Sequence, residues 1–203
     1  MARAMQIFKP ILLEGSPGVG KTSLVSGLAS VTGSTLCRIN LSDQTDLSDL
    51  FGSDMPVEGG ESGQFEWKNA PFLTAMQEGH WVLLDEMNLA SQQVLEGLNP
   101  CLDYRGEVFV PELNRSFLRH PSFRIFAAQN PLAQGGNRKG LPRSFLDRFT
   151  RAFLSPLTQE DLVSICHAAA PEMSLETVHR MVTFVSQMEE RASDSTPFAQ
   201  RFL

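Results

Sequence analysis

The stretch that decides the fold is Gly15-Ser16-Pro17-Gly18-Val19-Gly20-Lys21-Thr22, which fits the pattern G-x-x-x-x-G-K-[ST] of a phosphate-binding loop. An apolar run, Ile11 to Leu13, precedes the loop, and the residues from Thr22 to Val31 have the pattern of a helix. The pattern predicts nucleotide binding when a strand enters the loop and a helix leaves it. The alternative is an ordinary glycine turn that happens to carry a lysine, which the two flanking elements disfavour.

Each loop residue type suits one task in holding a nucleotide. Backbone N–H groups of a glycine-rich turn can point at phosphates. Lys21 is expected to reach the outer phosphate oxygens, and the Thr22 hydroxyl is placed to hold Mg²⁺. The residues expected to contact the nucleotide are Gly15, Ser16, Pro17, Gly18, Val19, Gly20, Lys21, Thr22 and Ser23.

The composition is typical of an ordinary soluble globular protein. The chain has 203 residues, 42% hydrophobic and 20% charged, and its net charge of −6 with no basic stripe argues against direct nucleic-acid contact. No apolar stretch of signal-peptide or membrane-spanning length is present, so neither secretion nor membrane insertion is expected. Cys37, Cys101 and Cys166 lack the spacing of a disulfide framework or zinc site and are predicted to be core thiols in a reducing compartment.

Short apolar runs alternate with helical patterns, which predicts an α/β fold with parallel strands and crossover helices. After the loop, strands are expected at 35–41, 81–84, 123–128 and 151–154, and helices at 46–51, 71–78, 92–102 and 143–149. The glycine-rich segment 52–64 is predicted to be a loop or irregular hairpin, inserted outside the core. Residues 107–117 are predicted to form a β-hairpin, which either faces a substrate or subunit or is a passive surface excursion.

Two acids follow the apolar run Trp81 to Leu84 and form the second half of the expected site. A carboxylate at the end of a buried strand is how phosphate-loop ATPases hold Mg²⁺, so Asp85 is the expected metal ligand beside Thr22. Glu86 is then available to polarise the attacking water. The alternative is an acidic pair that only begins a solvated loop.

A further strand ends at the polar residues Gln129 and Asn130. The Asn130 amide is a candidate for contacting the γ-phosphate or orienting the water. The alternative is a turn-forming asparagine before Pro131.

Residues 139–151 form the basic patch of the chain. An arginine offered to a neighbouring subunit's γ-phosphate can raise turnover by about 10³ to 10⁵. Arg148 is the preferred candidate and Arg143 the second, while the alternative is a solvated basic helix face.

From Thr158 the pattern is helical. Thr158 is expected to cap one helix, with Asp161 three residues later, and Ser174 is expected to begin another.

Taken together, four segments resemble an AAA+ ATPase module. They are 15–22, 83–86, 126–131 and 141–149. Within that superfamily the chain looks most like one of the tandem modules of the midasin family, dynein-related ATPases that remodel pre-60S ribosomal particles. The segments that carry this closer resemblance are 39–46, 85–90 and 135–142.

The resemblance implies a phosphate-loop fold of AAA+ type whose five parallel strands have the order 5-1-4-3-2. It implies a core at residues 1–155 and an incomplete, truncated helical lid at 156–203, because none of Arg180, Arg191 and Arg201 fits the second sensor arginine of such lids. Asn130 would be the first sensor, and Arg148 a finger acting in trans. The segment 52–65 would be the insertion in the second helix, and 107–117 the hairpin before the sensor strand.

The functional expectations follow the same resemblance. The cofactors would be ATP and Mg²⁺, with catalysis by Glu86, Asn130 and Arg148, and Asn40 would restrain the catalytic glutamate until a ligand engages. The partners would be neighbouring AAA+ modules in a hexameric or pseudo-hexameric ring and, in the nucleus, a pre-60S ribosomal particle. Two alternatives stay open: a non-hydrolysing nucleotide-binding structural module of a ring, and an ATPase of the MoxR or mitochondrial adhesion-domain type.

Overall fold

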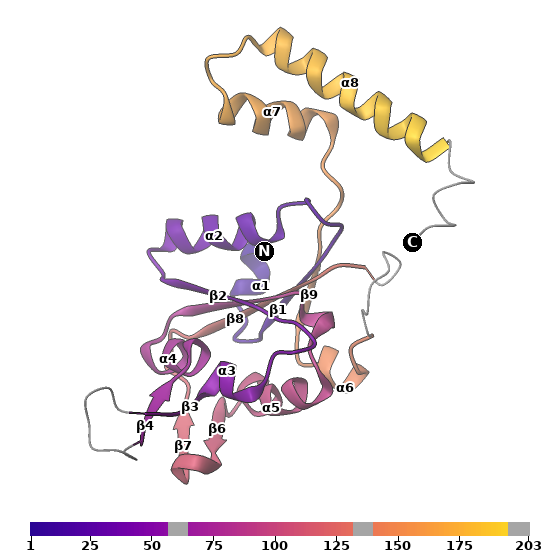
Figure 1. Ribbon diagram of the computed structural model, residues 1–203. Helices are drawn as coiled ribbons and strands as arrows, with labels where there is room; N and C mark the ends of the chain where they lie inside the picture. The colour runs from indigo at the N-terminus through magenta and orange to yellow at the C-terminus, as the bar shows by residue number, and fades with distance from the viewer. Residues whose placement is uncertain (57–64, 132–139, 195–203) are drawn as a thin grey trace. The chain divides into compact units, whose positions relative to one another are not determined.

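Five parallel strands form the sheet that carries the glycine-rich loop. The computed structural model describes residues 1–56, 65–131 and 140–194. The strands are β1 (Ile11–Glu14), β2 (Leu36–Asn40), β5 (Trp81–Asp85), β8 (Arg124–Gln129) and β9 (Thr150–Phe153), and Figure 1 shows helices on both sides of their sheet. They lie side by side in the order β2-β5-β8-β1-β9. Read from β9 and numbered along the chain, this is the order 5-1-4-3-2, so the predicted fold class is confirmed.

Side chains alternate between the two faces of the sheet, and helices cover both. On one face, Leu13 and Leu83 pack with Val25 of α2 (Lys21–Thr32), and the short helix α1 (Ala2–Met5) also packs there. On the other face, Leu12 and Leu84 pack with α3 (Leu47–Phe51), α4 (Pro71–Glu78) and α5 (Gln92–Leu102). Because helices cover both faces of the sheet, β5 is buried at all five positions. A strand covered in this way has a nearly continuous apolar sequence, as Trp81 to Leu84 does.

Three helices begin or end at a glycine, proline or serine that favours that position. Helix α2 ends at Gly33, whose φ of +66° is the left-handed conformation that glycine adopts readily. Helix α4 begins with Pro71 at its first turn and ends at Gly79, also left-handed. Helix α5 has Ser91 as its N-cap, and the Ser91 side chain accepts a hydrogen bond from the Val94 N–H. The predicted bounds of α5 are confirmed.

Two antiparallel strand pairs project from the sheet. Strand β3 (Gly52–Pro56) begins the predicted insertion and pairs with β4 (Phe65–Asn69), which extends beyond its predicted end, and residues 57–64 lie outside the described residues. Strands β6 (Glu107–Val110) and β7 (Arg115–Leu118) confirm the predicted hairpin, with the short 3₁₀ helix η2 (Pro111–Leu113) and a left-handed Asn114 at its turn. A second 3₁₀ helix, η1 (Met87–Leu89), follows β5.

The predicted helix over 143–149 is wrong in length. Helix α6 spans only Arg143–Leu146, and the chain then turns to enter β9. The Thr150 N–H donates to the Pro10 carbonyl at 2.8 Å, which ties this segment to the start of β1. Because the chain pairs with the central sheet from Thr150 onward, α6 ends at Leu146, although the helical sequence pattern continues to Phe149.

The chain divides into two units, Met1–Ser155 and Pro156–Leu203. The described part of the second unit contains α7 (Gln159–Ala169) and α8 (Leu175–Asp194), which contact each other. The predicted Thr158 cap is confirmed: its Oγ1 accepts from the Asp161 N–H at 3.2 Å, and Asp161 accepts from the Thr158 N–H at 2.9 Å. Hydrogen bonds from the Thr158 backbone and hydroxyl lower the pKa of Asp161.

Among the described residues, every helix is too short or too polar to cross a bilayer.

The prediction of three core thiols is only partly right. Cys101 lies near the end of α5 and is fully buried, and burial raises the pKa of its thiol to about 12. Cys37 is half-buried, with its pKa also raised by burial, and Cys166 is exposed. Cys166 lies on α7, which has no buried residue among those described, so the prediction is wrong there.

The cysteines should therefore react at very different rates with a chromogenic disulfide reagent at pH 8. Reaction requires the thiolate, and a pKa near 12 lowers the thiolate fraction of Cys101 roughly 10³-fold relative to an ordinary thiol. We expect the fast absorbance phase to disappear in Cys166→Ser and to persist in Cys101→Ser. A fast phase that survives in Cys166→Ser and disappears in Cys101→Ser would contradict this assignment.

Candidate functional site

The predicted site residues come together in a pocket of about 310 Å³ at the carboxyl ends of the strands. Three segments supply its lining: the glycine-rich loop, the end of β5 and the end of β8. Of the predicted set, Gly15, Ser16, Val19 and Arg148 do not line this pocket. The lining residues are Pro17, Gly18, Gly20, Lys21, Thr22, Ser23, Asp85, Glu86 and Asn130.

The loop backbone has the shape that phosphate binding requires. A Cβ at Gly15 would stand 2.9 Å from the Leu154 carbonyl oxygen, so the start of the loop packs too closely for a side chain. Gly18 and Gly20 have φ of +78° and +87°, and a Cβ at either would meet no heavy atom within 4 Å. Open space therefore lies beside both glycines, where a phosphate group could approach the backbone.

Helix α2 directs its N-terminus toward this space. Gly20 is its N-cap, and among the described residues no side chain caps it and no acid lies in its first turn. The N-terminal end of a helix carries a partial positive charge and N–H groups suited to an anion. The loop and helix together fit the phosphates of a nucleotide.

Lys21 lies inside the loop and is 8% exposed. Its Nζ donates to the carbonyl oxygens of Gly15 and Ser16, at 2.8 and 2.9 Å, and to Asn130 Oδ1 at 2.7 Å. A buried ammonium group needs acceptors of this kind. Phosphate oxygens are acceptors too, and they can take over these positions when a nucleotide binds.

Asp85 accepts hydrogen bonds from Thr22, Arg38 and the Glu86 backbone. Its Oδ2 accepts from Thr22 Oγ1 at 3.1 Å and from Arg38, through Nη2 at 2.6 Å and Nε at 3.1 Å. Its Oδ1 accepts from the Glu86 N–H at 3.1 Å. The hydroxyl and carboxylate of Thr22 and Asp85 are the oxygen donors that suit Mg²⁺, which is commonly held by one or two carboxylates together with substrate phosphates.

Glu86 is fixed by its own backbone and by Asn130. Its φ of 54° and ψ of 44° place it in the left-handed region, which is unusual for a residue with a side chain and clusters at functional sites. Asn130 Nδ2 donates to Glu86 Oε1 at 2.6 Å, while Asn130 Oδ1 accepts from Lys21. With a donor on one side and an acceptor on the other, the orientation of the Asn130 amide follows from its partners.

The expected restraint of Glu86 by Asn40 is not what the structure shows. Asn40 lies at the exposed end of the edge strand β2, beside Asp85 in register, and its side chain makes no hydrogen bond within the described residues. Asn130 holds the glutamate instead. The amide of the neighbouring inner strand reaches Glu86, and that of the edge strand does not.

The two arginine candidates lie outside the pocket. Arg148 forms an ion pair with Asp103, the C-cap residue of α5, and its side chain is 29% exposed. Arg143 is exposed at the start of α6. Neither is among the described residues that line the pocket, which fits a role toward a neighbour and equally a surface role.

Two residues of the site were not predicted from the sequence. Arg38, on β2, pairs with Asp85, and Asn88, only 2% exposed, donates from Nδ2 to the Asn130 carbonyl oxygen at 3.1 Å. Arg38 could have been found from the sequence, because it is a cation between the apolar residues Cys37 and Ile39 near the end of a predicted strand. Asn88 offers a weaker signal, a polar residue between Met87 and Leu89.

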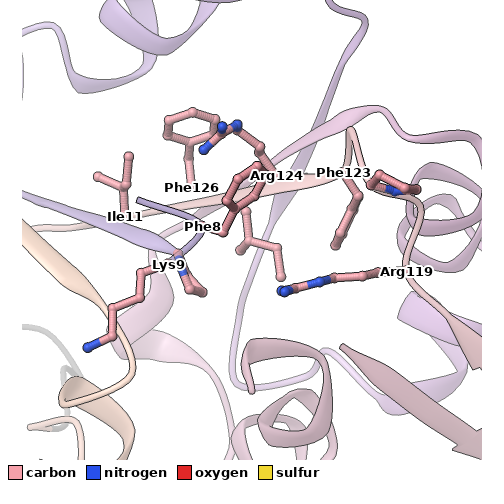
Figure 2. Close-up of a pocket in the computed structure, with 10 residues that line it drawn as sticks. Phe8, Lys9, Ile11, Arg119, Phe123, Arg124 and Phe126 are labelled. Carbon is pink, nitrogen blue, oxygen red and sulfur yellow. The ribbon is translucent and has the colours of Figure 1, made fainter. Parts of the chain in front are cut away.

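A second hollow lies at the amino ends of β1 and β8, away from the loop. Figure 2 shows Phe8 and Arg124 against each other there, and the Arg124 guanidinium lies 4.9 Å from the centre of the Phe8 ring. The hollow is only about 30 Å³, room for about one or two waters, and none of the predicted site residues lines it. The predicted residues that line a pocket, Lys21, Asp85 and Asn130 among them, lie at the opposite end of the strands.

Comparison with known proteins places the chain in a family. The AAA domain (dynein-related subfamily) matches residues 10–149. Midasin of Dictyostelium discoideum is 56% identical over 199 residues, covering 98% of this chain and 3% of that protein. Midasin of Giardia intestinalis is 52% identical over 161 residues, covering 79% of this chain and 3% of that protein. The resemblance to midasins is confirmed, and the chain spans about 3% of their length.

Two other comparisons are more distant. An uncharacterized protein of Staphylococcus aureus is 35% identical over 124 residues, covering 60% of this chain and 47% of that protein. A solved structure of a proposed ATPase from Cytophaga hutchinsonii has a TM-score of 0.61 at 24% identity, covers 86% of this chain and 53% of that chain, and supports the fold. The chain belongs to the dynein-related subfamily of AAA domains and is a midasin-like AAA+ module.

Proposed function

We propose that this module binds ATP together with Mg²⁺ in the pocket at the carboxyl edge of the sheet and hydrolyses the ATP to ADP and phosphate. The observation that carries the proposal is the meeting of Lys21, Thr22, Asp85, Glu86 and Asn130 around one pocket, although they come from three separate segments. The membership of the chain in the dynein-related AAA subfamily supports ATP as the nucleotide.

Each residue takes a task that its position allows. Lys21 and the N-terminus of α2 bind the phosphates, while Thr22 and Asp85 hold Mg²⁺. The metal, when bound, neutralises developing negative charge on the phosphate oxygens. Glu86 accepts the proton of the attacking water as a general base. Asn130, which contacts both Lys21 and Glu86, orients the glutamate relative to the terminal phosphate.

Completion of the site is proposed to need a neighbouring AAA+ module. The described residues that line the pocket include no arginine, whereas AAA+ hydrolysis draws on an arginine supplied in trans. Arg148 is the proposed donor, held near the surface by Asp103, and Arg143 is the second choice. In a ring, the arginine of one module would reach the pocket of the next.

The similarity to midasins supports a wider role. We propose that nucleotide turnover by this module contributes to the remodelling of pre-60S ribosomal particles in the nucleus, within a much longer ring-forming protein. A non-hydrolysing structural module is the second candidate, because the described residues that line the pocket include no arginine that could complete it. Identity of 56% to a midasin makes the MoxR-type alternative the weaker one.

Calorimetric titration of the chain with ATP, with and without Mg²⁺, tests the binding step. We expect one site per chain and a lower dissociation constant when Mg²⁺ is present, since Thr22 and Asp85 would hold the metal and the metal would supply positive charge for the phosphates. An absence of binding heat at millimolar ATP under both conditions, in a protein with the expected circular dichroism, would contradict the proposal.

A further inference from the structure

An arginine on the edge strand holds the expected metal ligand. Strand β2 pairs with β5 so that Arg38 lies opposite Leu83 and Asn40 opposite Asp85, and the Arg38 side chain extends along the sheet to the carboxylate. Arg38 donates from Nη2 at 2.6 Å and from Nε at 3.1 Å, both to Asp85 Oδ2. The Arg38 side chain is 57% exposed and that of Asp85 is 11% exposed.

Both donors reach the oxygen that a metal would need. Asp85 Oδ2 also accepts from Thr22 Oγ1 at 3.1 Å, so the proposed Mg²⁺ ligands and the guanidinium meet at one atom. Arginine does not lose its charge at any physiological pH. A divalent cation bound at Oδ2 would therefore be repelled by the guanidinium in its present position.

We propose that Arg38 is a positioning residue that occupies Asp85 while Mg²⁺ is absent and competes with Mg²⁺ for Oδ2. This inference rests on the proposed function, since it assigns a counter-ion to the same site. Without metal, Arg38 compensates the charge of a carboxylate that lies mostly out of water. When the metal binds, Arg38 leaves toward solvent, to which its side chain already has access because it is 57% exposed on an edge strand.

Substituting Arg38 by glutamine should make Mg²⁺ bind more readily. We expect the Mg²⁺ concentration at half-maximal tightening of ATP binding to fall about tenfold in Arg38→Gln, since one competing cation is removed. Arg38→Lys keeps the charge and loses the two-nitrogen contact, so a shift of about threefold in the same direction is expected. The matched control is Arg151→Gln on β9, the edge strand at the opposite side of the sheet, which removes another arginine–carboxylate pair of 2.6 Å, with Glu14. Its midpoint should stay that of the wild type.

A second measurement separates this inference from the proposed function. Thermal unfolding of each variant is followed against Mg²⁺ concentration without nucleotide, and Arg38→Gln should gain its Mg²⁺-induced rise in Tm at a lower concentration than the wild type. An unchanged or higher midpoint in Arg38→Gln, or in Arg38→Lys if the first variant does not fold, would overturn the role of Arg38. Failure of the wild type to bind ATP would instead overturn the proposed function, and the Mg²⁺ melting curves would still decide about Arg38.

Discussion

Replacing Lys21 by alanine is expected to weaken ATP binding by about 100-fold, the largest single loss of affinity in the site. A hydrogen bond to a charged group contributes about 1.5–3 kcal/mol, and each factor of ten in affinity corresponds to about 1.4 kcal/mol. Lys21 is a buried cation at the centre of the loop, and its Nζ has acceptors among the described residues, on Gly15, Ser16 and Asn130, that phosphate oxygens can replace. Titration with a fluorescent ATP analogue measures the effect.

Lys9→Ala is the matched control for this loss. The Lys9 Nζ donates to the Asp147 carbonyl oxygen at 3.2 Å, beside the amino ends of the strands and away from the pocket. Its removal changes the net charge by the same amount and should leave the affinity for ATP unchanged. Binding by Lys21→Ala within about twofold of the wild type would show that the glycine-rich loop is not the phosphate site.

Replacing Glu86 by glutamine is expected to lower ATP turnover by about 10²- to 10⁴-fold, the range that general-base catalysis contributes. Binding of ATP should change by less than about threefold, because the Gln side-chain carbonyl can still accept the 2.6 Å hydrogen bond from Asn130 Nδ2. The variant therefore separates proton acceptance from the positioning of the side chain. Phosphate release under saturating ATP and Mg²⁺ is the measurement.

Glu96→Gln controls for the loss of a carboxylate. Glu96 is exposed on α5, where it accepts a hydrogen bond from Gln92 at 2.9 Å, and it does not line the pocket. Its turnover should equal that of the wild type. Equal turnover in Glu86→Gln and the wild type would exclude Glu86 as the base and leave the second acid of the pair with a structural role.

The sheet and the pocket could be predicted because their signals are local. The loop from Gly15 to Thr22 is contiguous, and the acids Asp85 and Glu86 directly follow the strand that positions them. Parallel strands bring their carboxyl ends to one edge, so Asn130 could be placed in the same pocket without knowing any distance. Helix ends were also readable, because Pro71 and Gly79 have conformational preferences that do not depend on distant residues.

The features that were missed depend on contacts between distant segments. The pairing of Arg38 with Asp85 requires the register between β2 and β5, which the sequence of neither strand contains. Likewise, the choice of Asn130 over Asn40 as the partner of Glu86 depends on which strand lies closer to the glutamate side chain. Helix α6 ends early because the next residues pair with β1 and Pro10, a tertiary contact that overrides the local pattern.

Mg²⁺-dependent ATP turnover per protomer, measured across a wide range of protein concentration beside Glu86→Gln, tests most directly whether this module is a working ATPase. We expect the rate per protomer to rise with protein concentration, as neighbouring copies supply Arg148 to one another's pockets, and to vanish in Glu86→Gln. A rate that stays at the Glu86→Gln background at every concentration, in a chain that binds ATP, would contradict hydrolysis and support a module in which the nucleotide has a structural role.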